Sequence, residues 1–307
     1  MDEFELIRRY FDCATDVDGV VVGIGDDGAV LEPTAGKQQV NVIDTLVEGV
    51  HFPKGFNASD IGYRVVAVNL SDIAAMGAAP RWMTLALSLP AADEPWLEAF
   101  AEGLHAAAKE YGIALVGGDT TTAPQVVATV QINGEVDVGT ALLRSGAKPG
   151  DTIYVTGTVG DAAAGLDGLL HGEPVKELLN RFARPSARVT YGQSLIGIAS
   201  AAIDLSDGLY GDLHKLLFAS GVGAEIDMAC LPLSDALVEH YPPERQRKFA
   251  LGGGDDYELC FTASMSPPDP GVMRLSAIGR VTASTDLVCR LDGEIVPFED
   301  SGYRHFR

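Results

Sequence analysis

Residues 59–77 read SDIGYRVVAVNLSDIAAMG, and this stretch decides how the first half of the chain folds. Its apolar residues recur at helical spacing after a Ser-Asp start, and a glycine closes it, so it predicts a buried amphipathic helix. Asp72 lies inside this apolar segment. Two interpretations of its carboxylate stay open: it lies on a solvated face, or it points inward and is held by a metal ion.

Helix and strand patterns alternate on both sides of this segment. Further helices are expected over residues 3–12, 93–111, 161–170, 186–201 and 209–220. Strands are expected within residues 20–43 and over 82–89, 114–116, 126–136, 152–156, 224–228 and 257–262. Asp292-Gly293, between two apolar runs, predicts a hairpin near the end of the sequence. This mixture predicts an α+β fold rather than a doubly wound parallel sheet.

The length of 307 residues favours two domains over one. The segment RSGAKPGD at residues 144–151 consists of turn residues with little to bury, which makes it the candidate boundary. We therefore expect an N-terminal domain over residues 1–145 and a C-terminal domain over residues 146–307.

The charge is strongly one-sided. Asp and Glu number 43 against 22 for Lys and Arg, which gives a formal net charge of -21. Such a field repels phosphate backbones and anionic lipids, so nucleic-acid binding and electrostatic membrane docking are disfavoured. An anionic ligand would need bridging cations.

The sequence also argues against a membrane span, a signal peptide and a disulfide framework. No apolar run approaches the ~18 residues of a spanning helix, and the first residues, MDEFELIRRYF, lack the basic-then-apolar order of a signal peptide. The cysteines stand apart and form no C-x-x-C pair, so reduced thiols in a cytoplasm are expected. They are Cys13, Cys230, Cys260 and Cys289.

Short clusters of acidic residues beside glycines hold most of the functional information. They read GIGDDG at 23–28, DT at 44–45, NLSD at 69–72, GGDT at 117–120, DLSDG at 204–208 and GGDDYE at 253–258. Glycine lets the backbone approach a ligand, and aspartate is a short, hard-oxygen ligand for Mg²⁺. Any one cluster is more simply a turn. Asp204 is harder to dismiss because it lies among apolar residues, and the six clusters together predict a polynuclear Mg²⁺ site.

Two familiar phosphate-binding motifs are excluded. GIGDDG matches G-x-G-x-x-G formally, but the residues that follow, Ala29-Val30-Leu31, look extended, whereas the dinucleotide motif requires a helix to begin at the glycines. The sequence contains no G-x-x-x-x-G-K-[ST] motif either. A nucleotide, if bound, is therefore not held by a P-loop.

Read in chain order, seven motifs closely resemble those of the thiamine-monophosphate kinase family: GIGDDGAV, DTLVEGVHF, VNLSDIAAMGAAP, GGDTT, ALLRSGAKPGD, IDLSDGL and GGDDYELCF. The segment GYRHF at 302–306 resembles the end of that family's sequences. The family belongs to the superfamily of aminoimidazole ribonucleotide synthetase, selenophosphate synthetase and a hydrogenase-maturation protein. The resemblance implies two α/β domains, with the N-terminal domains of two subunits pairing in a homodimer and the C-terminal domain completing the active site.

The resemblance also implies a reaction and a set of site residues. The reaction is ATP-dependent phosphorylation of thiamine monophosphate to thiamine diphosphate, with several Mg²⁺ ions and usually K⁺. The implied Mg²⁺ ligands are Asp27, Asp44, Asp72, Asp119, Asp204 and Asp207. The implied ATP contacts are Gly118, Asp119, Arg144 and Ser206. The implied contacts to thiamine monophosphate are His51, Asp255 and Tyr303.

Plainer interpretations of three of these residues stay open. Arg144 suits phosphate through its rigid guanidinium, but it equally suits a salt bridge at a domain boundary. His51 is also readily explained as a histidine packed beside Phe52. Tyr303 is either surface packing or a ring that covers the ligand's aromatic ring.

The sequence departs from the family pattern at three places. Val42 and Ile43 stand where the family usually has Ser-Thr, so two side-chain oxygens are lost from the second motif. Asp255 replaces the usual Glu and shortens the reach to substrate by one methylene, while Gly28 in place of Cys or Thr is a small change.

Two other functions stay open at this point. One is another ATP-using member of the superfamily with a different acceptor, and the other is a non-catalytic protein that binds nucleotide or divalent cations. Selenophosphate synthetase relatives carry a reactive Cys in a Gly-rich N-terminal loop, and hydrogenase-maturation relatives end in Cys. Here Cys13 precedes the first motif and the sequence ends in His305-Phe306-Arg307.

Overall fold

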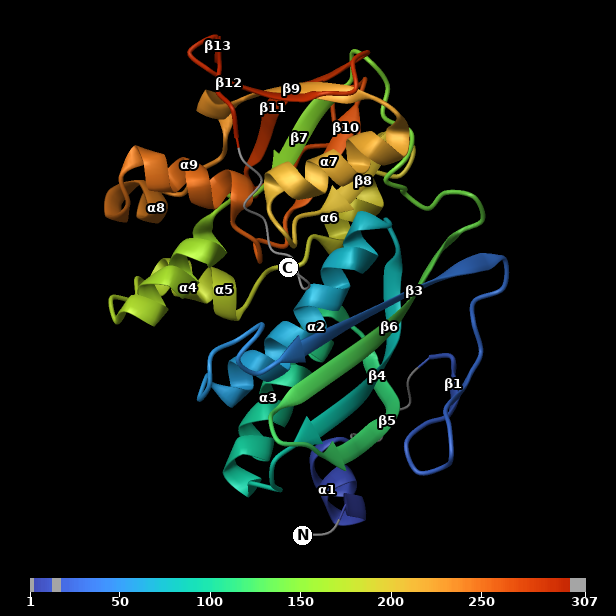
Figure 1. The fold of residues 1–307 in the computed structure, drawn as a ribbon. Helices are drawn as coiled ribbons and strands as arrows, with labels where there is room; N and C mark the ends of the chain where they lie inside the picture. Colours follow the sequence, from blue (N-terminus) through green and yellow to red (C-terminus); the bar gives the residue numbers. More distant parts are fainter. Residues whose placement is uncertain (1–2, 13–17, 299–307) are drawn as a thin grey trace. The chain divides into compact units, whose positions relative to one another are not determined.

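The computed structural model describes residues 3–12 and 18–298, and the chain divides into two compact units (Figure 1). Unit 1 comprises residues 1–73 and 78–139, and unit 2 comprises residues 74–77 and 140–307. Helices and strands mix in both units, which confirms the expected α+β class. No helix in the described part of the chain is long and apolar enough to cross a membrane.

Unit 1 is built on a four-stranded sheet with the order β3-β6-β4-β5. The pairs β3–β6 and β6–β4 are antiparallel, and β4–β5 is parallel. A short antiparallel pair, β1–β2, precedes this sheet. In chain order the elements are α1 (Glu3–Tyr10), β1 (Val20–Val22), β2 (Val30–Leu31), β3 (Lys37–Val47), α2 (Ala58–Ala75), β4 (Ala79–Leu89), α3 (Glu94–Tyr111), β5 (Ala114–Thr122) and β6 (Val127–Asp137).

Helices α2 and α3 pack closely because each has a glycine at their crossing. A Cβ on Gly62 would lie 2.0 Å from the carbonyl oxygen of Phe100, and one on Gly103 would lie 1.8 Å from that of Ser59. Helix α3 begins and ends where the sequence predicts. The carboxylate of Asp93 accepts a hydrogen bond from the Trp96 amide at 3.5 Å, and the left-handed Gly112 ends the helix.

The two faces of the unit 1 sheet differ in character. On β4 and β6, alternate side chains such as Leu85, Leu87 and Val130 are buried. The residues between them lie on a more polar face, on which Thr129 of β6 hydrogen-bonds with Thr45 of β3 at 2.9 Å. This alternation of buried apolar and partly exposed polar residues is typical of a sheet with only one face on its core.

Unit 2 contains a seven-stranded sheet with the order β13-β12-β9-β11-β7-β10-β8, in which only the β12–β9 pair is parallel. Helix α6 packs tightly within this unit, because a Cβ on Gly192 would lie 2.1 Å from the carbonyl oxygen of Ala74. The elements are β7 (Thr152–Thr156), α4 (Asp161–His171), α5 (Lys176–Ala183), α6 (Val189–Ser194), β8 (Ala201–Asp204), α7 (Leu209–Ser220), β9 (Gly223–Asp227), η1 (Met228–Cys230), α8 (Asp235–His240), α9 (Pro243–Gly252), β10 (Leu259–Ala263), β11 (Leu275–Thr282), β12 (Leu287–Leu291) and β13 (Glu294–Ile295).

The expectation of a single helix over residues 186–201 is wrong. Helix α6 covers only Val189–Ser194, the left-handed Gly197 interrupts the chain, and β8 begins at Ala201. The strand Ala201–Asp204 is buried at every position. Such a strand shows no alternation, so its apolar run looks the same as a buried helix in the sequence.

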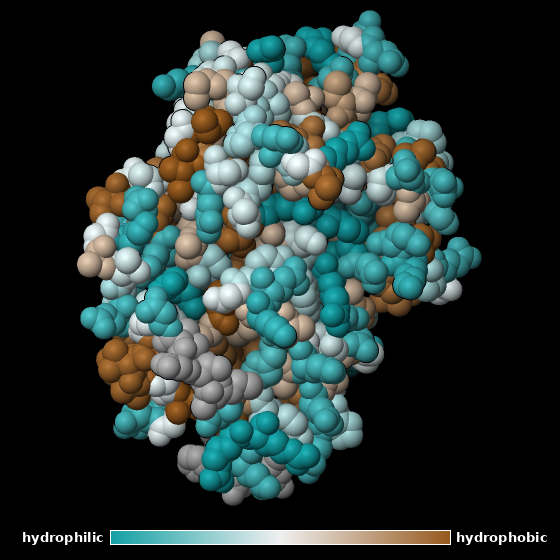
Figure 2. Space-filling model, turned by 180° about the vertical axis from the view of Figure 1, so that it is seen from behind, coloured by the Kyte–Doolittle hydropathy of each residue, from teal (hydrophilic) through white to brown (hydrophobic). Residues whose placement is uncertain are grey.

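The hairpin at Asp292-Gly293 is confirmed. Strands β12 and β13 pair antiparallel, and both turn residues have positive φ, of 53° and 86°. Two positive φ angles suit the right-handed twist of the flanking strands. The surface seen in Figure 2 is mostly hydrophilic, with hydrophobic residues in small groups, in keeping with the excess of acidic residues.

Candidate active site

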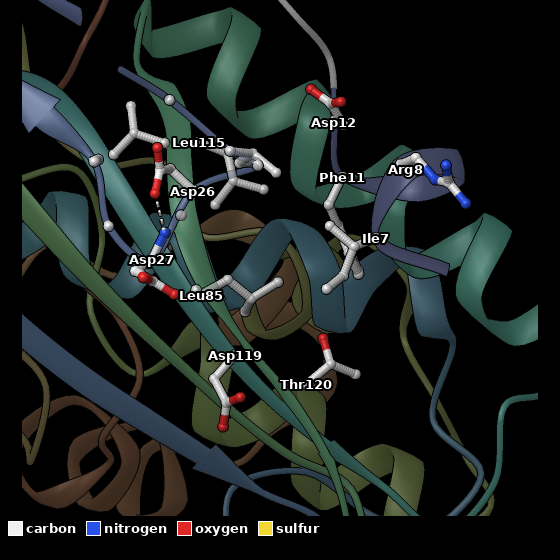
Figure 3. Close-up of a pocket in the computed structure, with 18 residues that line it drawn as sticks. Ile7, Arg8, Phe11, Asp12, Asp26, Asp27, Leu85, Leu115, Asp119 and Thr120 are labelled. Carbon is white, nitrogen blue, oxygen red and sulfur yellow. Dashed lines mark hydrogen bonds between the residues drawn. The ribbon is translucent and has the colours of Figure 1, made fainter. Parts of the chain in front are cut away.

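A pocket of about 830 Å³ in unit 1 brings two of the acidic motifs together (Figure 3). Asp26 and Asp27 from the loop after β1 line it together with Asp119 of β5, and Ile7 of helix α1 and Phe11, just after that helix, lie on the other side. Its full lining is Ile7, Arg8, Phe11, Asp12, Gly23, Ile24, Gly25, Asp26, Asp27, Gly28, Ala29, Leu85, Leu115, Val116, Gly117, Gly118, Asp119 and Thr120. The pocket thus combines an apolar side with exposed carboxylates.

The acidic loop is shaped by its own backbone. The Asp27 amide donates a hydrogen bond to Oδ1 of Asp26 at 2.8 Å, and Ile24 forms a β-bridge with Asp26. Gly25 has a φ of 120°, a region open to glycine. The chain then enters β2 at Val30, and no helix begins at these glycines. The rejection of the dinucleotide motif is therefore confirmed.

Gly118 is glycine for a steric reason. It pairs with Leu85 of the parallel neighbour β4, and a Cβ at position 118 would lie 1.9 Å from the Leu85 carbonyl oxygen. Any larger residue would push β5 away from β4 and displace Asp119, which follows it in the pocket wall. The family resemblance implies Gly118 as an ATP contact, and the structure adds its role in strand packing.

Three further candidate residues of unit 1 lie outside the pocket lining. Asp44 is half-buried on β3, and Asp72 is half-buried near the end of α2, between the fully buried Ser71 and Ile73. His51 follows β3, and its Nδ1 accepts a hydrogen bond from the Val47 amide at 3.0 Å. In the neutral ring the proton must then be on Nε2, which makes that nitrogen a donor.

The two departures before Asp44 lie on opposite faces of β3. Val42 is half-buried and shares the face of Asp44, because side chains two residues apart in a strand point the same way. Ile43 is 64% exposed and points to the polar face of the sheet. Of the two lost side-chain oxygens, only the one at position 42 would have shared a face with the Asp44 carboxylate.

In unit 2, the motif DLSDG joins β8 to α7. Asp204 ends β8 and is only 4% exposed, whereas Ser206 and Asp207 are half-buried in the connecting loop. Lys215 Nζ lies 2.6 Å from Oδ2 of Asp207 and 2.8 Å from Oδ1 of Asp212. Burial raises the pKa of Asp212 against the opposing effect of Lys215. Burial lowers the pKa of Lys215, but its two carboxylate partners outweigh this and raise it overall.

The motif GGDDYE divides into one half-buried acid and two structural ones. Asp255 has a φ of 74°, a left-handed conformation that Asp tolerates better than most residues. The carboxylate of Asp256 accepts hydrogen bonds from the amides of Gly160 and Ala162, at 2.6 and 3.3 Å, and so caps α4. Burial raises the pKa of Asp256 well above its usual range despite these donors.

Glu258 is the centre of a buried ion cluster that sequence reasoning missed. It is fully buried and accepts hydrogen bonds from Arg181 at 2.6 Å, from Arg188 at 2.6 and 2.5 Å, and from Thr156 at 2.7 Å. Arg181 Nη2 also lies 3.5 Å from the Asp256 carbonyl oxygen. The arginines stand on α5 and just before α6, and no pattern in the sequence connects them to position 258.

Two of the predicted site residues, Arg144 and Tyr303, lie outside the motifs described so far. Arg144 is exposed, and its carbonyl accepts a hydrogen bond from Ser220 Oγ at 3.1 Å, which ties the segment around it to α7. Tyr303 lies outside the described residues. The expected absence of disulfides holds for the described cysteines: Cys230, Cys260 and Cys289 are free thiols.

The donor set fits Mg²⁺ carried on a phosphate better than a preformed metal cage. Among residues 3–12 and 18–298, no three His, Cys, Asp or Glu side chains lie close enough to hold one ion. Mg²⁺ commonly takes one or two carboxylates and completes its shell with phosphate oxygens and water. Asp27 and Asp119, exposed in one pocket, suit that arrangement. Asn69 lies one turn before Asp72 on α2. Its side-chain oxygen is buried and accepts no hydrogen bond from the described residues, so it is a further candidate oxygen ligand.

Comparison with known proteins defines the class first. Residues 25–136 match the family model for the N-terminal domain of AIR synthase related proteins, and residues 148–266 match that for their C-terminal domain. Thiamine-monophosphate kinase of Escherichia coli (strain K12) is 47% identical over 320 residues, covering 99% of this chain and 98% of the relative.

Two solved structures agree. Thiamine-monophosphate kinase from Stenotrophomonas maltophilia K279a has a TM-score of 0.84 at 44% identity, covering 92% of this chain and 93% of that one. AaThiL in complex with AMPPCP and TMP has a TM-score of 0.80 at 35% identity, covering 92% of both chains. This chain belongs to the thiamine-monophosphate kinase family, as its motifs predict.

Proposed function

We propose that this chain transfers the γ-phosphoryl group of ATP to thiamine monophosphate, giving thiamine diphosphate and ADP. The observation that carries the proposal is the unit 1 pocket, where the loop of Asp26 and Asp27 meets Gly117–Thr120. Its carboxylates suit a metal-bound triphosphate, and its apolar side suits a base. The family's AaThiL structure in complex with AMPPCP and TMP supports the same pair of reactants.

The reaction needs no protein nucleophile. An oxygen of the acceptor phosphate, already ionised, attacks the γ-phosphorus in line, and the bond from that phosphorus to the bridging oxygen of ADP breaks. Both reactants are anions, so the chain must position them and neutralise their charge. When bound, Mg²⁺ supplies that neutralisation. The aspartates proposed to hold it are Asp27, Asp44, Asp72, Asp119, Asp204 and Asp207.

Other residues bind the two reactants. For ATP we assign Gly118, Asp119, Arg144 and Ser206. For thiamine monophosphate we assign His51, Asp255 and Tyr303. His51 suits the substrate phosphate because the Val47 amide donates to its Nδ1, so that in the neutral ring Nε2 carries the proton and is the donor. The carboxylate of Asp255 suits a cationic thiazolium or an aminopyrimidine.

We further propose that two copies of the chain form a homodimer, that K⁺ supports the reaction and that the enzyme works in the cytoplasm. The polar, partly exposed face of the unit 1 sheet, with strands of 11 residues, is a suitable surface for a second copy. Light scattering during gel filtration tests the dimer. Replacing K⁺ by Na⁺ in the assay tests the ion.

The function is tested by ADP release from ATP and Mg²⁺, with and without thiamine monophosphate, together with chromatographic detection of thiamine diphosphate. We expect diphosphate from the unaltered chain and none from Asp72→Asn, whose far-ultraviolet circular dichroism should be unchanged. Asp286→Asn, at an exposed position just before β12, is the matched control and should retain activity. If ATP binds and no diphosphate forms, the assigned acceptor is wrong.

A further inference from the structure

Asp207, a proposed Mg²⁺ ligand, forms an ion pair with the ammonium of Lys215. Lys215 Nζ lies 2.6 Å from its Oδ2, and both side chains are about 40% exposed. The lysine projects from α7, two turns beyond the loop that carries Asp207. The pair is therefore held by one short loop-to-helix connection rather than by chance contact between distant surfaces.

A second carboxylate keeps this lysine in place. Asp212, one turn before Lys215 on α7, is 1% exposed and accepts a hydrogen bond from Nζ through Oδ1 at 2.8 Å. Its other oxygen, Oδ2, accepts the amides of Ser206 at 3.0 Å and Asp207 at 2.9 Å. Asp212 thus fixes the backbone of the proposed ligand loop and the position of the ammonium at the same time.

The two ends of this bridge differ in burial. Asp212 is enclosed, so the loss of its charge partner would leave a carboxylate without solvent, which is costly. Asp207 is open to solvent, and an exposed ion pair contributes little. Lys215 can therefore release Asp207 while it keeps Asp212, and the reverse exchange is disfavoured.

We propose that Lys215 is a resident counter-ion of Asp207, which neutralises this carboxylate in the metal-free enzyme and must be displaced when Mg²⁺ binds there. The proposal rests on the assignment of Asp207 as a Mg²⁺ ligand. It makes Lys215 a positioning residue that sets the Mg²⁺ concentration at which the enzyme becomes active. Without the ammonium, the divalent ion no longer competes for Oδ2 and no longer meets a neighbouring positive charge.

The test is the apparent Mg²⁺ affinity of the protein in the presence of AMPPCP, obtained by isothermal titration calorimetry at stepped Mg²⁺ concentrations, together with the Mg²⁺ dependence of turnover at saturating ATP and thiamine monophosphate. Lys215→Met keeps most of the length of the side chain and removes its charge; because it also removes the partner of the buried Asp212, its melting temperature is measured alongside. We expect it to bind Mg²⁺ roughly three- to fivefold more tightly and to reach half-maximal turnover at correspondingly lower Mg²⁺. Lys215→Arg keeps the charge and should stay within about twofold of the unaltered chain.

Lys176→Met removes the same charge from an exposed position on α5 and controls for the change in net charge. Unchanged or weaker Mg²⁺ binding by Lys215→Met would overturn the proposal, as would an equal gain in Lys176→Met. A rise in KM for ATP alone would instead make Lys215 a nucleotide contact and also overturn it. Asp207→Asn tests separately whether Asp207 is a Mg²⁺ ligand, because unaltered Mg²⁺ binding in that variant would remove it from the ligand set. Failure of the proposed kinase activity would instead appear as missing thiamine diphosphate in the unaltered chain.

Discussion

Replacing Glu258 by Gln should strongly destabilise unit 2. The carboxylate is fully buried and accepts four hydrogen bonds, three of them from Arg181 and Arg188. Glutamine has nearly the same shape but no charge, and its amide nitrogen would face a guanidinium donor. The substitution thus leaves two arginines beside a neutral partner and places the glutamine NH₂ group against a guanidinium N–H, so that two donors face each other.

The expected size follows from the burial of the partners. Breaking a buried ion pair by removing one member costs about 3–5 kcal/mol. The arginine side chains are 20–21% exposed, so water can reach them in part, and we expect the lower end, about 3 kcal/mol. For a unit of this size, that corresponds to a fall in melting temperature of roughly 6–12 °C.

The assay can distinguish the two units. The two tryptophans, Trp82 and Trp96, both lie in unit 1, so tryptophan fluorescence follows unit 1 only. Far-ultraviolet circular dichroism and calorimetry follow the whole chain. We expect Glu258→Gln to lower the unfolding transition seen by calorimetry more than the one seen by fluorescence.

A matched control is Glu225→Gln, which removes the same charge from an exposed pair with Arg290 on the same sheet. It should leave the melting temperature nearly unchanged. A shift below about 2 °C in Glu258→Gln, or an equal shift in Glu225→Gln, would refute the idea that the buried cluster anchors unit 2.

Further outcomes follow from packing and from thiol chemistry. Gly118→Ala should cost about 1–3 kcal/mol of stability and weaken ATP binding, because its Cβ meets a β4 carbonyl. Gly28→Ala, with nothing within 4 Å of its Cβ, should be tolerated. Chemical denaturation and nucleotide titration compare the two variants, and equal stability would contradict the steric argument. Among the described cysteines, Cys230 should be alkylated first by iodoacetamide at pH 8, since it is exposed. Cys260 is buried, and burial raises the pKa of Cys289 to about 11, so that almost no thiolate forms there. Mass spectrometry of peptides should show labelling of the buried pair only after denaturation, and early labelling of either would count against the buried packing.

Much of the fold could be predicted where local chemistry decides it. Asp93 and Gly112 fix the ends of α3, and Asp292-Gly293 fixes the last hairpin, because these residues act on their own neighbours. The helix predicted over residues 186–201 was wrong for the opposite reason. Whether Ala201–Asp204 is helix or strand depends on its pairing with β10, a contact between residues far apart in the sequence.

The candidate site shows the same division. The sequence could indicate that aspartates beside glycines bind metal and phosphate, and the structure brings Asp27 and Asp119 into one pocket. It could not tell which acid of GGDDYE is structural. Asp256 caps a helix and Glu258 pairs with two arginines, and both roles depend on partners some 70 to 100 residues away along the chain.

The contact of Gly192 with Ala74 bears on the order in which this chain can fold during synthesis. Unit 2 includes residues 74–77, which leave the ribosome before β4, whereas α6 leaves it after β7. The Ala74 carbonyl, which lies against Gly192, is therefore made before β4, β5 and β6 of the unit 1 sheet, and its partner is made after them. Domains generally fold as they emerge, so unit 1 can complete its core first, and unit 2 can close only late. A chain that begins at Thr140 would lack one of its own packing partners from the start.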